Sequence, residues 1–183
     1  FQTKTYEKKT TLPCKTDVCA EVKIVVPEVS NIPVVADSIN KKIFNTVRGI
    51  VYFGEKPSDG KTYEEVMAAF IDSYDKLKEE YADERPGWEA KVEASVAYTS
   101  DKILNIKLHN YTFTGGAHGY DGNRSLIFDK ATGKSLEKND ILKDTVAFKV
   151  LAEKKFREKF KIPAAKPINS TGMMFMKEVF ELP

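Results

Sequence analysis

The chain has 183 residues, of which 42% are hydrophobic and 31% are charged, enough apolar material for one domain or two small ones. Its 29 basic and 27 acidic residues leave a net charge of +2, and most of the basic residues are Lys. This balance argues against nucleic acid or an anionic membrane as a partner, because such binding relies on basic patches in which Arg is prominent. No run of about 18 apolar residues occurs, so no segment is expected to span a membrane.

The first residues, Phe1 to Lys4, are already polar and typical of a strand. They include neither an initiator Met nor the apolar region of a signal peptide. We therefore expect a mature protein or an excised piece of one, with any signal peptide or lipid anchor encoded upstream.

Two strands and a helix are predicted in the first 51 residues. Residues 4–12 and 19–26 have the alternation of a strand, and Asn31-Ile32-Pro33 marks a helix start, with Pro tolerated in the first turn. The apolar positions of the second strand are Val22, Ile24 and Val26. The apolar stripe of the helix is Ile39, Ile43, Val47 and Ile50, flanked by Phe44 and Val51.

A second helix is predicted from Thr62 to about Asp83. Its start, Thr62-Tyr63-Glu64-Glu65, fits a capping box, in which a hydroxyl and a carboxylate satisfy free N–H groups, and Arg85-Pro86-Gly87 ends it. Its apolar face is Val66, Phe70, Tyr74, Leu77 and Tyr81.

From Trp88 onward the hydrophobic period changes to two. Two alternating runs on either side of Ser100-Asp101 predict an antiparallel hairpin, and a third strand is predicted over 122–129. Gly133 suits a tight turn that needs positive φ. A third helix is predicted over 145–160, with Asp144 as its cap. Its apolar side is Phe148, Leu151, Ala152, Phe156 and Phe160. The apolar tail, 173–182, is ambiguous between helix and strand.

The order of these elements predicts the fold class. Successive strands joined by tight turns favour an antiparallel sheet, and helices that arrive as insertions favour an α+β fold over a parallel doubly wound one. We expect an antiparallel sheet or sheets with about three packed helices.

Common catalytic motifs are missing from the sequence. It has two His residues, His109 and His118, too few for most three-ligand zinc sites, and it lacks zinc-protease, nucleophile-elbow, P-loop and dinucleotide motifs. A Cys–His nucleophilic pair is conceivable, but nothing marks Cys14 or Cys19 as an activated thiolate. We expect no catalytic residue, no metal and no cofactor.

The segment at 111–120, YTFTGGAHGY, is the strongest candidate for a binding site. Its glycines could offer N–H groups to an anion, with His118 as acid or base. We favour a structural alternative, a bulged strand end with His118 as a hydrogen-bonding pin. The candidate binding residues are Tyr111, Phe113, Gly115, Gly116, His118, Gly119 and Tyr120. Their aromatic members could form a platform for a glycan or a protein, or could simply pack across strands.

Cys14 and Cys19 lie close together in the sequence. They could form a short disulfide in an oxidising compartment or remain a pair of free thiols, and their spacing is not that of a Cys-x-x-Cys redox or zinc motif.

Several motifs occur in an order that resembles a known domain pair. They are 111–119 (YTFTGGAHG), Asn123, 128–134 (FDKATGK) and 140–142 (DIL). They resemble a bacterial exported domain of unknown function, and the preceding part resembles its usual companion, a PdaC-type accessory module. Such pairs occur in envelope lipoproteins and in the lysozyme-binding sensor of the anti-sigma factor RsiV. The resemblance implies an N-terminal α+β module, residues 1–98, packed on a C-terminal α+β module, residues 99–183.

The resemblance also implies a function and a location. We expect a non-catalytic binding or sensor module outside the cytoplasm, lipid-anchored in the full-length protein, with a lysozyme-like protein or peptidoglycan as partner. The alternative is a glycan hydrolase or deacetylase that uses His118. In that compartment we expect Cys14 and Cys19 to be joined. Related domains continue past the equivalent of Pro183, and the tail is dense in apolar residues, so we expect the C-terminal module to be truncated.

Overall fold

The computed structural model describes residues 1–13, 19–81, 86–172, 175 and 177–182. The chain forms two compact units, Phe1–Ser135 and Leu136–Pro183, which are taken separately below. Among the helices of the described residues, none is long and apolar enough to cross a membrane.

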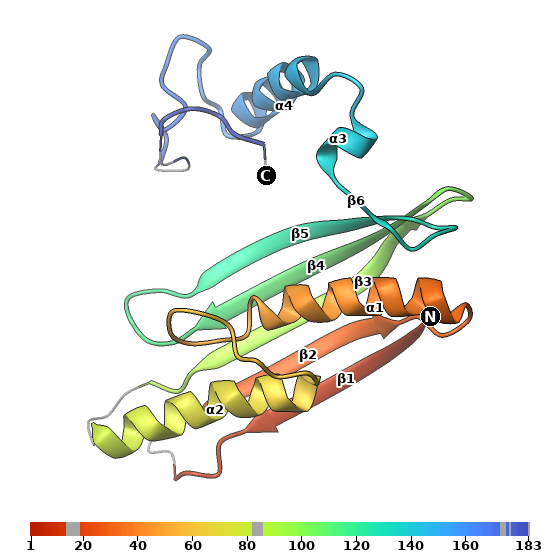
Figure 1. Ribbon diagram of the computed structural model, residues 1–183. Helices are drawn as coiled ribbons and strands as arrows, with labels where there is room; N and C mark the ends of the chain where they lie inside the picture. Colours follow the sequence, from red (N-terminus) through yellow and green to blue (C-terminus); the bar gives the residue numbers. More distant parts are fainter. Residues whose placement is uncertain (14–18, 82–85, 173–174, 176, 183) are drawn as a thin grey trace. The chain divides into compact units, whose positions relative to one another are not determined.

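The first unit is built on a single mixed sheet whose strands lie side by side in sequence order (Figure 1). Its strands are β1 (Gln2–Lys9), β2 (Glu21–Glu28), β3 (Glu89–Thr99), β4 (Ile103–Phe113), β5 (Tyr120–Asp129) and the two-residue β6 (Ser135–Leu136). Strands β1 and β2, β3 and β4, and β4 and β5 pair antiparallel, whereas β2 and β3 pair parallel. The parallel pair arises because two helices cross over between β2 and β3, as parallel neighbours require.

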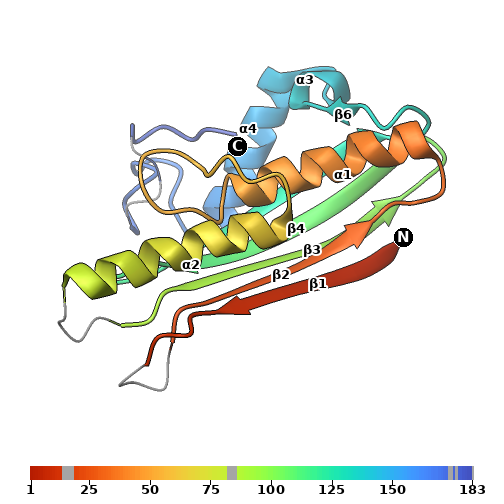
Figure 2. The ribbon, with the colours of Figure 1, turned by 60° about the horizontal axis from the view of Figure 1, so that its bottom comes forward.

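The two crossover helices, α1 (Pro33–Arg48) and α2 (Tyr63–Glu80), cover one face of the sheet (Figures 1 and 2). Because side chains alternate along β2, its apolar residues Val22, Ile24 and Val26 point toward these helices. The apolar stripes predicted for the two helices pack against them from the other side. The best-buried members of this core include Ile24, Ile39, Ile43, Val47, Phe70, Ile106, Leu108 and Phe128. Burial of each such side chain contributes roughly 1.5–3 kcal/mol to folding.

The other face of the sheet carries charged side chains in cross-strand pairs. Lys23 Nζ lies 2.6 Å from a carboxylate oxygen of Glu7, its direct partner across β1 and β2, and Lys9 lies 2.8 Å from Glu21. This alternation of apolar and polar faces is typical of an antiparallel sheet with one face in solvent.

The start of α2 has the predicted capping hydrogen bonds, but one of them is made to a different backbone N–H than expected. The Thr62 hydroxyl accepts a hydrogen bond from the Glu65 N–H at 3.2 Å, whereas the Glu65 carboxylate accepts from the N–H of Lys61, one residue before the expected partner. The helix ends at Glu80, earlier than predicted, and residues 82–85 lie outside the described part of the chain.

The α+β class with a largely antiparallel sheet is confirmed, as are the predicted strands and three substantial helices. The boundary expected at residues 98 and 99 falls in the β3–β4 hairpin of the continuous sheet, whereas the compact units divide between Ser135 and Leu136.

The second unit contains the short helix α3 (Lys138–Ile141), the helix α4 (Thr145–Lys159) and an irregular tail. Asp144 caps α4 as predicted, accepting a hydrogen bond from the Ala147 N–H at 2.9 Å. A small apolar cluster is formed by Ile162, Ile168 and Phe180, against which Ala152, Phe156, Phe175 and Leu182 pack. The described part of the tail from 175 to 182 forms neither helix nor strand.

The apolar side predicted for the third helix is only partly covered, by the packing of Ala152 and Phe156 on this cluster. In α4, Phe148 is 41% exposed and Leu151 is 53% exposed, and no residue of the helix is fully buried. Apolar residues such as Val146 and Val150 also lie outside the predicted stripe and are exposed, so the helix lacks one continuous apolar face.

Candidate functional site

The glycine-rich segment at 114–119 connects β4 to β5. Gly115 and Gly116 have φ values of +97° and +95°, which side chains with a Cβ rarely adopt, and a Cβ at either position would meet nothing within 4 Å. At Gly119, by contrast, a Cβ would lie 2.5 Å from the Tyr111 ring. The glycines are thus required by the backbone of the connection and by the close approach of one aromatic ring.

His118 does not have the environment expected of a structural pin. Its side chain is exposed, and Nδ1 makes one contact, 3.3 Å from the carbonyl oxygen of the adjacent Gly119. No described carboxylate orients the ring. The hydrogen bond expected for His118 is thus a single long contact with the neighbouring backbone, made by an exposed side chain.

The candidate aromatic residues of this segment do not form a single platform. Successive side chains of a strand point to opposite faces, so Tyr111 and Phe113 lie on the face away from the helices. Tyr120 lies on the helix face, where it lines a cavity together with Thr112. The candidate binding residues are thus divided between two surfaces.

The other histidine, His109, has the partner that His118 lacks. Its Nε2 lies 2.7 Å from an Asp121 carboxylate oxygen on β5, on the charged face of the sheet. Both side chains are exposed, and such pairs contribute little to stability. The pair would have been expected from sequence only if the register of β4 and β5 were known.

A cavity of about 260 Å³ lies on the helix face next to the glycine-rich connection. Asn110 on β4 is fully buried there, and Arg124 Nη1 on β5 donates a hydrogen bond of 2.6 Å to Asn110 Oδ1. We call this cavity the arginine pocket. Its lining residues are Gly49, Ile50, Tyr52, Asn110, Thr112, Tyr120 and Arg124.

A larger cavity, of about 450 Å³, lies where β1 and the end of β2 meet α1 and the start of α2. Three half-buried rings contribute to its wall: the Tyr6 and Tyr63 centroids are 4.7 Å apart, and Phe44 meets Tyr63 edge-on at 5.2 Å. We call this cavity the aromatic pocket. Rings in tilted or edge-to-face arrangements at these separations attract one another, and together they give the cavity an apolar wall.

Polar side chains surround the rings of the aromatic pocket. Three of them are carboxylates, Glu28, Asp37 and Glu64, and two are the ammonium groups of Lys41 and Lys61. All five are exposed, so they can change partners without loss of buried contacts. The rim therefore offers both acceptors and donors around an apolar surface.

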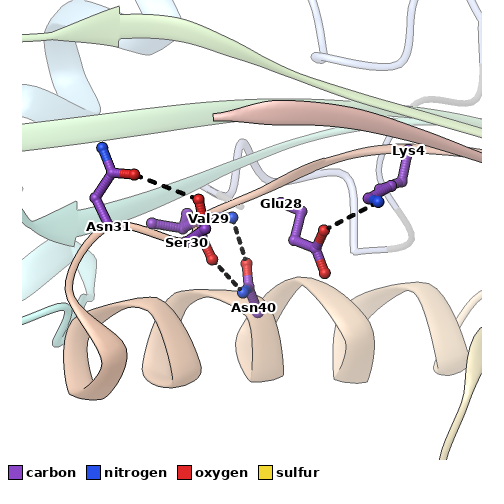
Figure 3. Close-up of polar contacts among 6 residues, drawn as sticks. All are labelled: Lys4, Glu28, Val29, Ser30, Asn31 and Asn40. Atoms are coloured by element: carbon purple, nitrogen blue, oxygen red, sulfur yellow. Dashed lines mark hydrogen bonds and ion pairs between the residues drawn. The ribbon is translucent and has the colours of Figure 1, made fainter.

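The end of β2 is fixed against α1 by Asn40 (Figure 3). The Asn40 side chain accepts from the Val29 N–H at 3.0 Å and donates to the Val29 carbonyl at 2.9 Å. Beside this contact, Lys4 Nζ lies 3.6 Å from Glu28 (Figure 3). Asn40 also lines the aromatic pocket, so the same side chain that positions the strand shapes the cavity.

Both tyrosines of the aromatic pocket remain protonated phenols at neutral pH. Burial raises the pKa of Tyr63 strongly, and the nearby Tyr6 and Glu28 raise it further. The pKa of Tyr6 is also raised, first by burial and then by the nearby Glu28 and Glu64. Neither phenol therefore carries charge over the ordinary pH range.

Sequence reasoning found neither pocket. The rings of the aromatic pocket come from residues 6, 44 and 63, and Asn110 looks like an ordinary polar position between Leu108 and Thr112. A signal was nevertheless present, because Asn110 continues the inward series Leu104, Ile106 and Leu108 at period two. A polar residue at such a position is informative.

The described residues bring no three His, Cys, Asp or Glu side chains together as metal ligands. Cys14 lies outside the described residues, so the predicted Cys14–Cys19 pairing remains a prediction.

The fold places the chain in a class of α+β domains in which a crossover of two helices covers a largely antiparallel sheet. The chain belongs to the deacetylase PdaC family, whose model matches residues 14–121. That match runs through the β3–β4 hairpin and includes the glycine-rich connection.

Two solved bacterial structures, both DUF3298 family proteins, have a similar fold. The one from Pseudomonas aeruginosa PAO1 is 23% identical, with a TM-score of 0.59 over 88% of this chain and 68% of its own. The one from Bacteroides fragilis NCTC 9343 is 17% identical, with a TM-score of 0.61 over 90% of this chain and 70% of its own. Among curated proteins none matches the chain.

Proposed function

We propose that this chain is an extracytoplasmic, non-catalytic binding module that holds cell-wall glycan in the aromatic pocket. The observation that carries the proposal is the half-buried Tyr6–Tyr63 ring pair, with centroids 4.7 Å apart, surrounded by exposed carboxylates and ammonium groups. The resemblance to exported envelope domains implies peptidoglycan as a partner, and the matching family is described as a deacetylase.

The chemistry of a sugar suits this arrangement. The faces of a pyranose ring carry C–H groups that pack on aromatic rings, and its hydroxyl and amide groups need donors and acceptors at the edge. Glu28 and Asp37 supply acceptors, and Lys61 and the phenols supply donors. A cavity of about 450 Å³ lies within the range of small-ligand sites.

Location outside the cytoplasm and a lipid anchor in the full-length protein are part of this proposal. They rest on the resemblance to exported domains and on the predicted disulfide. To test the location, a reporter enzyme that is active only outside the cytoplasm can be fused to the product of the complete gene. Its activity is compared with that of the same reporter kept in the cytoplasm.

The binding test is sedimentation of the protein with insoluble peptidoglycan. Tyr6→Leu and Asp37→Asn should each reduce the bound fraction several-fold, because they remove a ring or a charged acceptor. Tyr98→Leu is the matched control, since Tyr98 is an exposed tyrosine of the same sheet outside the pocket. Equal retention of all variants, or none by the wild type, would refute glycan binding in this pocket.

A lysozyme-like protein is the other partner that the resemblance implies, and lysozyme immobilised on a resin tests it with the same variants. Retention that Tyr6→Leu leaves unchanged would favour a protein partner at another surface. Released acetate and new reducing ends, assayed in the same samples, test the catalytic alternative. A turnover that His118→Ala removes would overturn the non-catalytic proposal.

A further inference from the structure

Asn110 is the only fully buried polar or charged side chain among the described residues, with 0% exposure. Its Oδ1 accepts a hydrogen bond from Arg124, but its Nδ2 is buried with no hydrogen-bond partner in the described structure. An unsatisfied buried amide N–H costs about 1–3 kcal/mol. Such a group in a native protein calls for a physical explanation.

The guanidinium of Arg124, beside Asn110, also has hydrogen-bond donors without a described protein partner. Its hydrogen bond to Asn110 engages one nitrogen, and no described acidic side chain pairs with the guanidinium. A guanidinium has five N–H donors in a planar fork, so most donors of the exposed Arg124 side chain remain available. A buried amide donor without a partner and a guanidinium with spare donors thus lie next to each other.

The absence of a side chain at Gly122 leaves room for Asn110 beside the pocket. At Gly122, opposite Asn110 on β5, a Cβ would lie 2.8 Å from Asn110 Oδ1. The remaining wall carries the hydroxyl groups of Tyr52, Thr112 and Tyr120, and the lining contains no Asp or Glu. The pocket is therefore rich in donors, and its one formal charge is positive.

The C-terminal end of α1 borders the same pocket and would oppose an anion through its dipole. The carbonyls of Asn45 and Val47 at that end already accept hydrogen bonds, from the N–H groups of Gly49, Ile50 and Val51 at 2.9–3.1 Å. These hydrogen bonds weaken the negative end of the dipole, and Arg124 is the only formal charge among the lining residues.

We propose that the arginine pocket binds a carboxylate group, either of a small organic acid or of a peptide C-terminus. A carboxylate is planar, carries one negative charge and accepts two parallel N–H bonds from a guanidinium. Because Asn110 Nδ2 is buried, a carboxylate oxygen would accept its hydrogen bond only after a small shift of the pocket wall. A cavity of about 260 Å³ accommodates this group and a few further atoms. This site is separate from the aromatic pocket, so the carboxylate proposal does not depend on whether the aromatic pocket binds glycan.

The test is an NMR titration of the 183-residue chain with acetate, with N-acetyl-alanyl-alanine, with the C-terminal amide of that dipeptide and with inorganic phosphate. We expect saturable shifts at Asn110 and Arg124 with at least one carboxylate compound and none with the amide. Binding of acetate alone indicates a small acid, and preference for the dipeptide indicates a peptide end. No saturation by either at about 10 mM, equal binding of the amide, or tighter binding of phosphate would overturn the proposal.

Two variants and a control test whether the carboxylate binds in the arginine pocket. Arg124→Gln should weaken the carboxylate at least about tenfold. Asn110→Asp should weaken it as much, because it removes the free donor and pairs the guanidinium with an internal carboxylate. The fold should be preserved, since Asp and Asn have the same shape. Lys107→Gln removes the same charge from the other face of β4 and should leave the affinity within about twofold. Unchanged affinity in Asn110→Asp would refute the site even if Arg124→Gln failed to fold.

Discussion

The Ser38 hydroxyl in α1 donates a hydrogen bond of 2.8 Å to the carbonyl oxygen of Gly133, in the turn between β5 and β6. The contact joins residues 95 positions apart and brings the turn against the first helix. Gly133 has a φ of +71°, and a Cβ there would lie 2.8 Å from the Val35 carbonyl oxygen. The glycine predicted from the turn is therefore also required by the helix beside it.

We expect Gly133→Ala to lower the free energy of unfolding by at least ~1 kcal/mol, because it adds both backbone strain and a clash with α1. Gly54→Ala is the matched comparison: its φ is +108°, but a Cβ there would meet nothing within 4 Å. Chemical denaturation of both variants measures the difference. A smaller loss at position 133 than at position 54 would contradict the close approach.

His118→Ala should change the stability by no more than about 0.5 kcal/mol, because the side chain is exposed and makes one long contact with its neighbour. Thermal unfolding of the variant and the wild type checks this. A loss of 1 kcal/mol or more, about what a buried hydrogen bond contributes, would restore the structural role first expected for this residue.

The Asp129 carboxyl should titrate below the usual range for Asp. Hydrogen bonds from the Thr132 hydroxyl and from backbone N–H groups lower its pKa. A folded pKa below the unfolded one means that the stabilisation is complete above the unfolded value and is lost as pH falls through the folded value. NMR titration of the side-chain carboxyl measures this directly, and Thr132→Val, which removes the hydroxyl, should raise the pKa. An unchanged pKa in that variant would contradict the assignment.

Tyr63 should ionise at higher pH than the exposed tyrosines, because burial raises its pKa. The unfolded phenol loses its proton near pH ~10, whereas the folded one keeps it, so stability falls as pH rises above that point. Tyr63→Phe should make the stability less sensitive to pH in the alkaline range. Denaturation curves at neutral and alkaline pH test this, with Tyr98→Phe as an exposed control.

Cys14 and Cys19 should be joined in protein prepared without reductant. The loop they close is short, so the disulfide should contribute about 2–3 kcal/mol by chain-closure entropy. Thiol titration of the unfolded, unreduced protein should find no free thiol, and reduction should lower the midpoint of unfolding. Two titratable thiols before reduction would contradict the pairing.

The local elements of this protein were readable from its sequence. The alternation of Val22, Ile24 and Val26, the Thr62 and Asp144 caps and the positive φ of Gly133 all appear in the structure as predicted. Each is decided by interactions between residues a few positions apart, which hydrophobic period and backbone sterics express directly. The predicted apolar side of α4 is covered only in part, because a period of apolar residues does not itself supply a surface to bury them.

The pairing of strands, and with it both pockets, was decided only by tertiary structure. The crossover of α1 and α2 makes β2 and β3 parallel neighbours and brings Tyr6 to Tyr63. The register of β4 and β5 sets Asn110 opposite Gly122 and within reach of Arg124. These contacts join residues far apart in the chain, and their geometry depends on how whole elements pack and which edges meet. The sequence therefore determined the elements and their buried faces, whereas packing determined which polar groups meet in a cavity.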